Sequence, residues 1–200
     1  MTRGIFILLE GIDRSGKSTQ TKLLFDYLSS QNVRAELLKF PNRNTDSGKI
    51  IDAYLSNNDY DDLTIHNLFS DNRKESKNHI IEVLNSGIHI ICDRYIYSGI
   101  AYGAAKGIPL DICKSSDRGL PIPDITIYLD IAPNKLLARD GFGNERYENV
   151  DFLANVRQKY DMIKEPSWIT IDADNTIANI HEMIKKIMMD FTITSPILHY

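Results

Sequence analysis

The segment from Gly11 to Ser18 reads GIDRSGKS and fits the pattern GxxxxGK[ST], which is typical of phosphate-binding loops. Such a loop surrounds phosphate oxygens with backbone N–H groups at the start of a helix, and its glycines let the chain turn tightly beside the ligand. Lys17 is placed to reach the β- and γ-phosphates of a nucleoside triphosphate, and Ser18 is placed to ligate Mg²⁺. The motif therefore predicts a triphosphate site formed by Gly11, Asp13, Arg14, Ser15, Gly16, Lys17, Ser18 and Thr19.

Charged residues also follow two other apolar runs, and these positions would meet the loop in a parallel sheet. Arg43 comes shortly after one run, and Asp93 and Arg94 come directly after another. Ligands of open parallel sheets bind beyond the carboxyl ends of the strands. A single loop arginine can equally be a solvated surface residue. Several that converge on a phosphate loop favour a second phosphate site, because arginines offset the repulsion between two polyanions.

The elements that must position these residues are short apolar runs alternating with longer amphipathic stretches. This pattern predicts an α/β fold, with a parallel five-stranded sheet covered by helices on both faces. The longest helical pattern covers about Thr64–Asn85, and Thr192–Tyr200 lacks a pattern and is expected to be a loose tail. We expect one domain over residues 1–200. The predicted strands are Ile5–Leu9, Ala35–Phe40, Ile88–Cys92, Ile125–Leu129 and Trp168–Asp172.

Composition narrows the classes of partner and compartment. The net charge is −4 and no basic block occurs, so we expect no nucleic-acid partner. The first apolar run has only five residues before Glu10, too few for a signal peptide or a membrane span. The two cysteines, Cys92 and Cys113, match no metal-ligand spacing, and Cys92 is expected in the core. A cytoplasmic protein, in the host cytoplasm if it is viral, fits this composition.

Four further motifs are FPNR at 40–43, LFSDNR at 68–73, DRY at 93–95 and GLPIPD at 119–124. They resemble those of the thymidylate kinase family and occur in the family's order. The resemblance runs from about Phe6 to Ile187, and ERYEN at 145–149 is similar to the eukaryotic and poxviral branch. It implies the three-layer fold of P-loop nucleoside monophosphate kinases. It also implies transfer of the ATP γ-phosphoryl group to dTMP, with Mg²⁺, giving dTDP and ADP for dTTP synthesis.

The resemblance assigns catalytic roles to Arg14, Lys17, Asp93 and Arg94. Arg14 would stabilise the migrating phosphoryl group from within the loop, as an arginine does in many phosphoryl-transfer enzymes. Asp93, with Ser18, would support Mg²⁺ directly or through its waters, although an acid at a strand end can also be a simple cap. Arg94 would bind the acceptor phosphate.

The resemblance also implies a pocket for the acceptor nucleotide. Phe69 would stack on thymine and Arg73 would bond its edge, whereas periodicity alone favours Phe69 as a core residue. Tyr102 would crowd a ribose 2′-hydroxyl, and Asp13 would lie near the sugar 3′-hydroxyl. The implied dTMP site consists of Asp13, Phe40, Arg43, Phe69, Arg73, Arg94, Ser98, Tyr102 and Tyr147.

The glycine-containing segment at about 139–148 is typical of a lid that closes on ATP and excludes water. By resemblance, its arginines Arg139 and Arg146 would lie near the donor nucleotide. A charged surface loop is the simpler interpretation of the same residues. The family is commonly homodimeric, and Thr64–Asn85 is a candidate interface.

Two other functions remain open on the residues alone. A kinase of another, or a broader, set of nucleoside monophosphates would share the phosphate loop but need a different base pocket. A nucleotide-binding protein without transferase activity would need no acceptor arginines. A GTPase would carry an NKxD-like motif, and the only Asn-Lys pair, Asn134-Lys135, is followed by two leucines.

Overall fold

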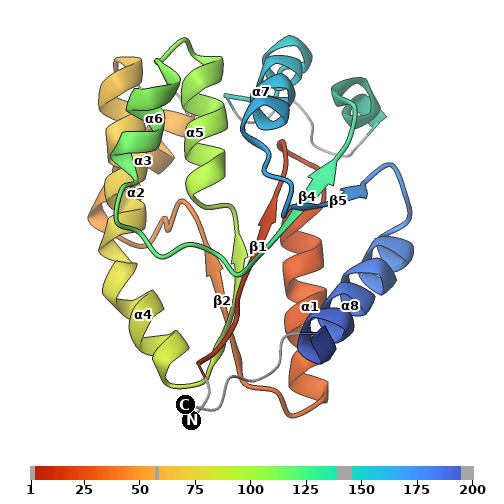
Figure 1. Ribbon diagram of the computed structural model, residues 1–200. Coiled ribbons are helices and arrows are strands. Elements are labelled where there is room, and N and C mark those ends of the chain that lie inside the picture. Colours follow the sequence, from red (N-terminus) through yellow and green to blue (C-terminus); the bar gives the residue numbers. More distant parts are fainter. Residues whose placement is uncertain (1–2, 57–58, 139–145, 195–200) are drawn as a thin grey trace.

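Five parallel strands form the centre of the molecule in the order β2-β3-β1-β4-β5. The computed structural model describes residues 3–56, 59–138 and 146–194, with side chains up to Phe191 (Figure 1). Each strand lies within one residue at either end of the predicted run, so the expected α/β sheet is confirmed. The strands are β1 (Phe6–Glu10), β2 (Ala35–Lys39), β3 (His89–Asp93), β4 (Ile125–Asp130) and β5 (Ile169–Asp172).

Helices cover both faces of this sheet. In Figure 1, α1 and α8 lie on one side, and α3, α4 and α5 lie on the other. All five residues of β1 are buried, as expected for a central strand of a parallel sheet. The helices are α1 (Lys17–Ser30), α2 (Asp46–Ser56), α3 (Asp62–Glu75), α4 (Lys77–Asn85), α5 (Ile96–Ala105), α6 (Leu110–Ser116), α7 (Val150–Ile163) and α8 (Ile177–Thr194), with a 3₁₀ helix, η1, at Pro133–Ala138.

The predicted single helix over Thr64–Asn85 is wrong, because the chain forms two helices, α3 and α4, that meet at Ser76. The Ser76 N–H donates to the carbonyl of Arg73, three residues earlier, and the Ser76 carbonyl accepts from Ile80 N–H. This tighter turn ends one helix and begins the next. Apolar residues recur at helical spacing on both sides of it, which is why periodicity did not reveal the break.

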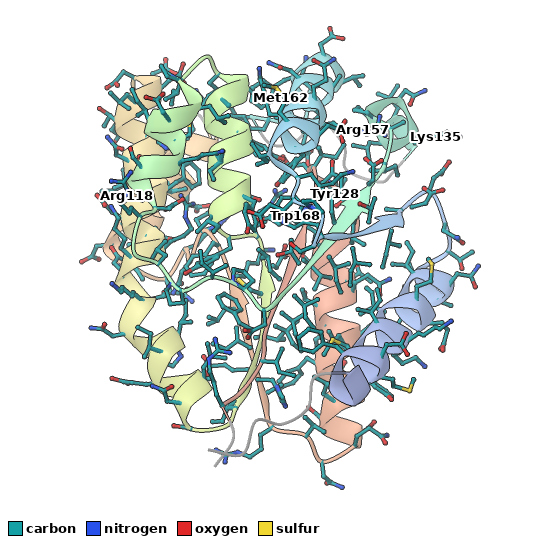
Figure 2. All side chains as sticks on the ribbon, viewed as in Figure 1. Arg118, Tyr128, Lys135, Arg157, Met162 and Trp168 are labelled. Atoms are coloured by element: carbon teal, nitrogen blue, oxygen red, sulfur yellow. The ribbon has the colours of Figure 1, made fainter. Side chains whose placement is uncertain are left out.

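Aromatic residues fill the core beneath α7. Figure 2 shows Tyr128 and Trp168 inside the molecule, and their ring centroids are 6.2 Å apart. Tyr128 also packs on Tyr160 of α7, with centroids 5.0 Å apart. Both cysteines are buried, and Cys92 lies in the core as predicted. The contact between Tyr128 and Tyr160 packs α7, the helix that follows the predicted lid, against β4.

Parts of two expectations fall outside the described residues. The predicted lid, 139–148, is described only from Arg146 onward. Helix α8 ends at Thr194, and the rest of the expected tail, 195–200, is not described. Within the described ranges, no helix is both long enough and apolar enough to cross a membrane.

Candidate active site

A cavity of about 820 Å³ opens at the carboxyl ends of the strands and brings most of the predicted site residues together. Its walls come from the phosphate loop, the segments after β2 and β3, and helices α3 and α5. Arg139 lies outside the described residues, and Gly11, Ser15 and Arg146 are not in the wall. The predicted residues that line the cavity are Asp13, Arg14, Gly16, Lys17, Ser18, Thr19, Phe40, Arg43, Phe69, Arg73, Asp93, Arg94, Ser98, Tyr102 and Tyr147.

The phosphate loop depends on two glycines with positive φ. Gly16, at the N-cap of α1, has φ 102°, and Gly11 has φ 147°. A Cβ at Gly11 would lie 2.5 Å from the carbonyl oxygen of Leu129, so the position has no room for a side chain. The loop therefore leaves β1 in a conformation that only glycine adopts without strain.

Lys17 is held inside the loop. Its Nζ donates to the carbonyl oxygen of Ile12 at 2.7 Å and to Ser15 Oγ at 3.3 Å. Burial lowers the pKa of Lys17 to about 7, and repulsion from Arg94 adds to this effect, while Asp93 and Asp13 oppose it. Without a bound anion, the ammonium is therefore only partly charged near neutral pH. A triphosphate beside Nζ would restore its charge.

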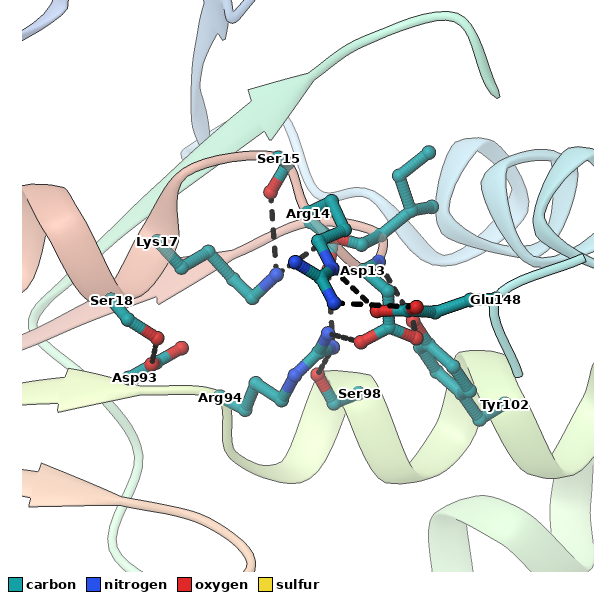
Figure 3. Close-up of polar contacts among 12 residues, drawn as sticks. Asp13, Arg14, Ser15, Lys17, Ser18, Asp93, Arg94, Ser98, Tyr102 and Glu148 are labelled. Atoms are coloured by element: carbon teal, nitrogen blue, oxygen red, sulfur yellow. Dashed lines mark hydrogen bonds and ion pairs between the residues drawn. The ribbon is translucent and has the colours of Figure 1, made fainter. Parts of the chain in front are cut away.

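Arg94 is the centre of a second cluster, shown in Figure 3. Its backbone has φ 67°, in the left-handed region, and Nη2 donates to Asp13 Oδ1 at 2.5 Å. Nη1 donates to Ser98 Oγ and to the Gly11 carbonyl oxygen, both at 3.2 Å. The Tyr102 hydroxyl donates to Asp13 Oδ2 at 2.8 Å. These contacts join the loop, the end of β3 and α5.

Charge within this cluster is set by Asp13. Burial alone would raise the pKa of its carboxyl, but Arg94 and Lys17 outweigh burial and lower it. Asp13 is therefore ionised at neutral pH. Its carboxylate partly neutralises Arg94 while leaving a net positive cavity for phosphate.

Ser18 and Asp93 face each other, as expected for a pair that supports Mg²⁺. Ser18 Oγ donates to Asp93 Oδ2, and Lys39 Nζ lies 3.1 Å from Ser18 Oγ. Asp93 Oδ1 is buried and has no hydrogen-bond partner among the described residues. Two oxygen ligands suit Mg²⁺, which keeps several waters and uses few protein groups. The residues present therefore fit the ion.

Glu148 is a site residue that the sequence analysis did not single out. It is buried, and its Oε1 accepts from Arg14 Nε at 2.5 Å, so the loop arginine is tied to the segment before α7 (Figure 3). Arg14 itself has φ 61°. Glu148 stood inside the ERYEN motif, but nothing in the residue pattern paired it with a loop 134 residues away.

Phe69 and Arg73 also line the cavity, one helical turn apart on α3. Phe69 lines the cavity and also packs on the apolar cluster around Ile65. One part of its ring is therefore available for stacking, while another part belongs to the core. Arg73 is buried and makes two hydrogen bonds to Asp117, at 3.0 and 2.8 Å. Asp117 was not predicted, because an acid after α6 has no sequence signal that sets it apart from a surface residue.

Helix α5 comes close to α3 because it carries glycines at the contact. A Cβ at Gly99 would lie 2.4 Å from Arg73 Nη2, and one at Gly103 would lie 2.7 Å from His66 Nδ1. His66 lines the cavity and was not predicted. Its Nε2 is buried without a hydrogen-bond partner among the described residues. The two glycines thus allow polar α3 side chains to line the cavity.

Arg146, the first described residue of the lid segment, lies against α2 and not in the cavity wall. Arg146 sits over the Tyr54 ring, 4.3 Å from its centroid, and donates to Asp59 at 2.9 Å. Tyr147 lines the cavity and its hydroxyl donates to the Tyr54 hydroxyl at 3.0 Å. In this arrangement the cavity receives Tyr147, while Arg146 contacts residues outside it.

The sequence model of the thymidylate kinase family matches residues 9–184. The chain belongs to the thymidylate kinase family. It is 43% identical over 198 residues to the thymidylate kinase of Schizosaccharomyces pombe, covering 96% of this chain and 94% of that protein. It is 41% identical over 193 residues to the human thymidylate kinase, covering 94% and 91%. A solved thymidylate kinase structure from Candida albicans aligns with a TM-score of 0.87 at 38% identity, covering 96% and 94%.

These comparisons confirm the expected fold and the expected enzyme class. A P-loop fold with a five-stranded parallel sheet is the architecture predicted from the resemblance. The thymidylate kinase family consists of nucleoside monophosphate kinases. An enzyme of this class needs one site for the phosphoryl donor and one for the nucleotide that accepts the phosphoryl group. Lys17 and Arg94, the residues predicted to meet the donor and the acceptor phosphates, both line the cavity.

Binding of ATP with Mg²⁺ should take up a proton in a pH-dependent way. Because the pKa of Lys17 is about 7 without ligand and the bound triphosphate raises it, uptake should be about 0.9 proton at pH 8 and about 0.1 at pH 6. Calorimetric titrations in buffers of different ionisation enthalpy measure this number. Equal uptake at both pH values would contradict the assignment to Lys17.

Replacing Asp117 should destabilise the fold through Arg73. The Asp117→Ala change leaves a buried guanidinium without its carboxylate, and we expect the free energy of unfolding to fall by about 3–5 kcal/mol. The control is Asp71→Ala, which breaks an exposed pair with Lys74 on the same helix and should cost under about 1 kcal/mol. Urea unfolding measures both free energies. Equal losses in the two variants would show that the buried Arg73–Asp117 pair contributes no more to stability than the exposed pair does.

Proposed function

We propose that this protein transfers the γ-phosphoryl group of ATP to the 5′-phosphate of dTMP, giving dTDP and ADP. The observation that carries the proposal is the meeting of Lys17 and Arg94 in one cavity wall. Lys17 belongs to a triphosphate loop, whereas Arg94 comes from the end of a neighbouring strand. Two separate cations suit two phosphate-bearing substrates that must approach each other against charge repulsion.

On the donor side, the loop amides and Lys17 would hold the triphosphate. Mg²⁺ would be held by Ser18 and by Asp93, whose buried Oδ1 has no other described partner, and it would neutralise charge on the donor phosphates. Arg14, anchored by Glu148, would stabilise charge on the migrating group. Little covalent chemistry is required of the protein, because phosphoryl transfer depends on positioning and electrostatics.

On the acceptor side, Arg94 and Arg43 would bind the 5′-phosphate. Asp13 and Tyr102 bond each other. Asp13 would lie near the sugar 3′-hydroxyl, and Tyr102 would crowd a ribose 2′-hydroxyl. Phe69 would stack on thymine while Arg73, oriented by Asp117, would bond its edge. Phe40, Ser98 and Tyr147 complete the proposed dTMP site.

A second candidate is the same transfer with a broader set of acceptors. The Candida albicans thymidylate kinase is described as having broad substrate specificity. In this chain, two glycines of α5 leave the cavity wall bare beside Arg73 and His66. A non-catalytic nucleotide-binding protein is less well supported, since it would have no use for Arg94 beside the phosphate loop.

The family resemblance also supports two properties of the whole protein. We infer a homodimer in solution and a cytoplasmic location.

Acceptor selectivity can be measured directly. With ATP and Mg²⁺, release of ADP should be fastest with dTMP among the deoxynucleoside monophosphates and slower with ribose counterparts, because Phe69, Arg73 and Tyr102 shape the base and sugar sites. A coupled ADP-release assay over the full panel tests this. Comparable kcat/KM for purine acceptors would favour the broader kinase, and no turnover with any acceptor would refute phosphoryl transfer.

Alanine variants of Arg94 and Arg14 should differ in which kinetic constant they change. Arg94→Ala should reduce kcat/KM for dTMP by about a thousandfold and leave the ATP dissociation constant within about threefold, because it removes an acceptor contact. Arg14→Ala should lower kcat by a similar factor with the KM for dTMP nearly unchanged. Steady-state kinetics and ATP binding give all four values. An Arg94→Ala enzyme with most of its activity would remove Arg94 from the acceptor site.

A further inference from the structure

Glu10, the last residue of β1, is a carboxylate enclosed in the core directly before the phosphate loop. It has 0% of its surface exposed. A buried carboxylate is tolerated where hydrogen-bond donors replace the water that it has lost. The identity of those donors therefore tells which parts of the molecule Glu10 holds.

Four hydrogen bonds reach the Glu10 carboxylate, from two helices. Oε1 accepts from the backbone N–H groups of Tyr95 and Ser98, both at 3.0 Å. Oε2 accepts from Ser98 Oγ at 2.6 Å and from the Tyr160 hydroxyl at 2.8 Å. The backbone donors form the N-terminal turn of α5, where the helix dipole favours a negative charge. Glu10 thus ties β1 to α5 and α7.

The hydrogens of this network determine what Ser98 can offer to Arg94. The Ser98 hydroxyl has one hydrogen, and the Glu10 carboxylate, which can only accept, takes it at 2.6 Å. Toward Arg94 and toward the Tyr160 hydroxyl, 2.9 Å away, Ser98 Oγ therefore offers only its lone pairs. Arg94 Nη1 donates to that oxygen at 3.2 Å. Arg94 is also held at an unusual backbone φ of 67° by its own N–H bond to the Leu9 carbonyl. The guanidinium therefore rests on a hydroxyl whose direction Glu10 sets.

We propose that Glu10 is a positioning residue for phosphoryl transfer, because its carboxylate directs the Ser98 hydroxyl and, through it, the guanidinium of Arg94. The inference rests on the proposed role of Arg94 at the acceptor phosphate. In this positioning role, both oxygens of the Glu10 side chain must accept hydrogen bonds. A glutamine fits the same space but places an NH₂ group either against two backbone donors or against the two hydroxyls. In the second arrangement the NH₂ group donates to Ser98 Oγ, so the Ser98 hydrogen turns to the Tyr160 hydroxyl, 2.9 Å away, and the lone pairs that accept from Arg94 change direction.

The test is Glu10→Gln, assayed with dTMP at saturating ATP. We expect kcat/KM for dTMP to fall by about tenfold to a hundredfold, as small misplacements of a phosphate ligand do. The ATP dissociation constant, measured at pH 6, should stay within about threefold. That pH is chosen because Glu10 also raises the pKa of Lys17, which is about 7, and at a pH below this value a lower pKa reduces the charged fraction of the lysine by a smaller factor than it does above it. Unchanged kinetics with dTMP would overturn the inference.

A matched control separates positioning from loss of stability. Asp130→Asn makes the same acid-to-amide change at the end of β4, where Asp130 pairs with Arg157 through two hydrogen bonds and contacts neither Ser98 nor Arg94. It should leave kcat/KM for dTMP within about threefold, whatever its effect on the melting temperature. An equal loss of activity in Asp130→Asn would overturn the inference, because the effect of Glu10→Gln would then be general.

A double-mutant cycle distinguishes failure of this inference from failure of the proposed function. In an Arg94→Ala background, Glu10→Gln should cause less than about a further threefold loss, since no guanidinium remains to be positioned. Multiplicative losses would refute positioning and leave the role of Arg94 intact. Full activity of Arg94→Ala alone would refute the proposed acceptor site, and this inference with it.

A second variant keeps the inference testable if Glu10→Gln does not fold. Ser98→Ala removes the hydroxyl between Glu10 and Arg94 but keeps the backbone bond from Ser98 to Glu10. It should raise the KM for dTMP by about tenfold and show the same non-additivity with Arg94→Ala. A Ser98→Ala enzyme with the parent KM would overturn the inference.

Discussion

Lys17 and Arg94 repel each other at the active site, and the neighbouring carboxylates must offset this repulsion. Burial and the neighbouring arginine lower the pKa of Lys17 to about 7, while the carboxylates of Asp13, Asp93 and Glu10 keep the cluster from becoming too positive. The balance leaves a site whose cations are held in place before any substrate arrives. Phosphate oxygens then supply the missing negative charge, which is how a preorganised site favours phosphoryl transfer.

The parallel sheet gives these charges their positions. Strands β1 and β3 are neighbours, with Leu9 paired to Asp93, so the phosphate loop and the Asp93-Arg94 segment leave the sheet side by side. The Arg94 N–H bonds to the Leu9 carbonyl and extends this pairing beyond the strands. On the other wall, glycines of α5 admit the polar side chains of α3. Backbone geometry thus places both halves of the cavity.

Local sequence patterns predicted the features of the structure that depend on residues close together in the chain. The phosphate loop follows from its motif, and the strands follow from apolar runs, so the convergence of Arg94 on Lys17 could be expected from the rule for parallel sheets. Glu10, Asp117 and Glu148 could not be found in this way, because a buried acid has the same letter as a surface one and its partner lies far along the chain. The break between α3 and α4 was missed because apolar residues recur at helical spacing on both sides of Ser76.

Whether donor and acceptor share this cavity can be tested with a bisubstrate compound in which adenosine and thymidine are joined through their 5′-oxygens by five phosphates. One cavity that holds both nucleotides with fixed cations should bind this compound at one per chain and at least about a hundredfold more tightly than ATP, because the second nucleotide binds without a separate entropic cost. Affinity no greater than that of ATP would contradict an account in which donor and acceptor share this cavity.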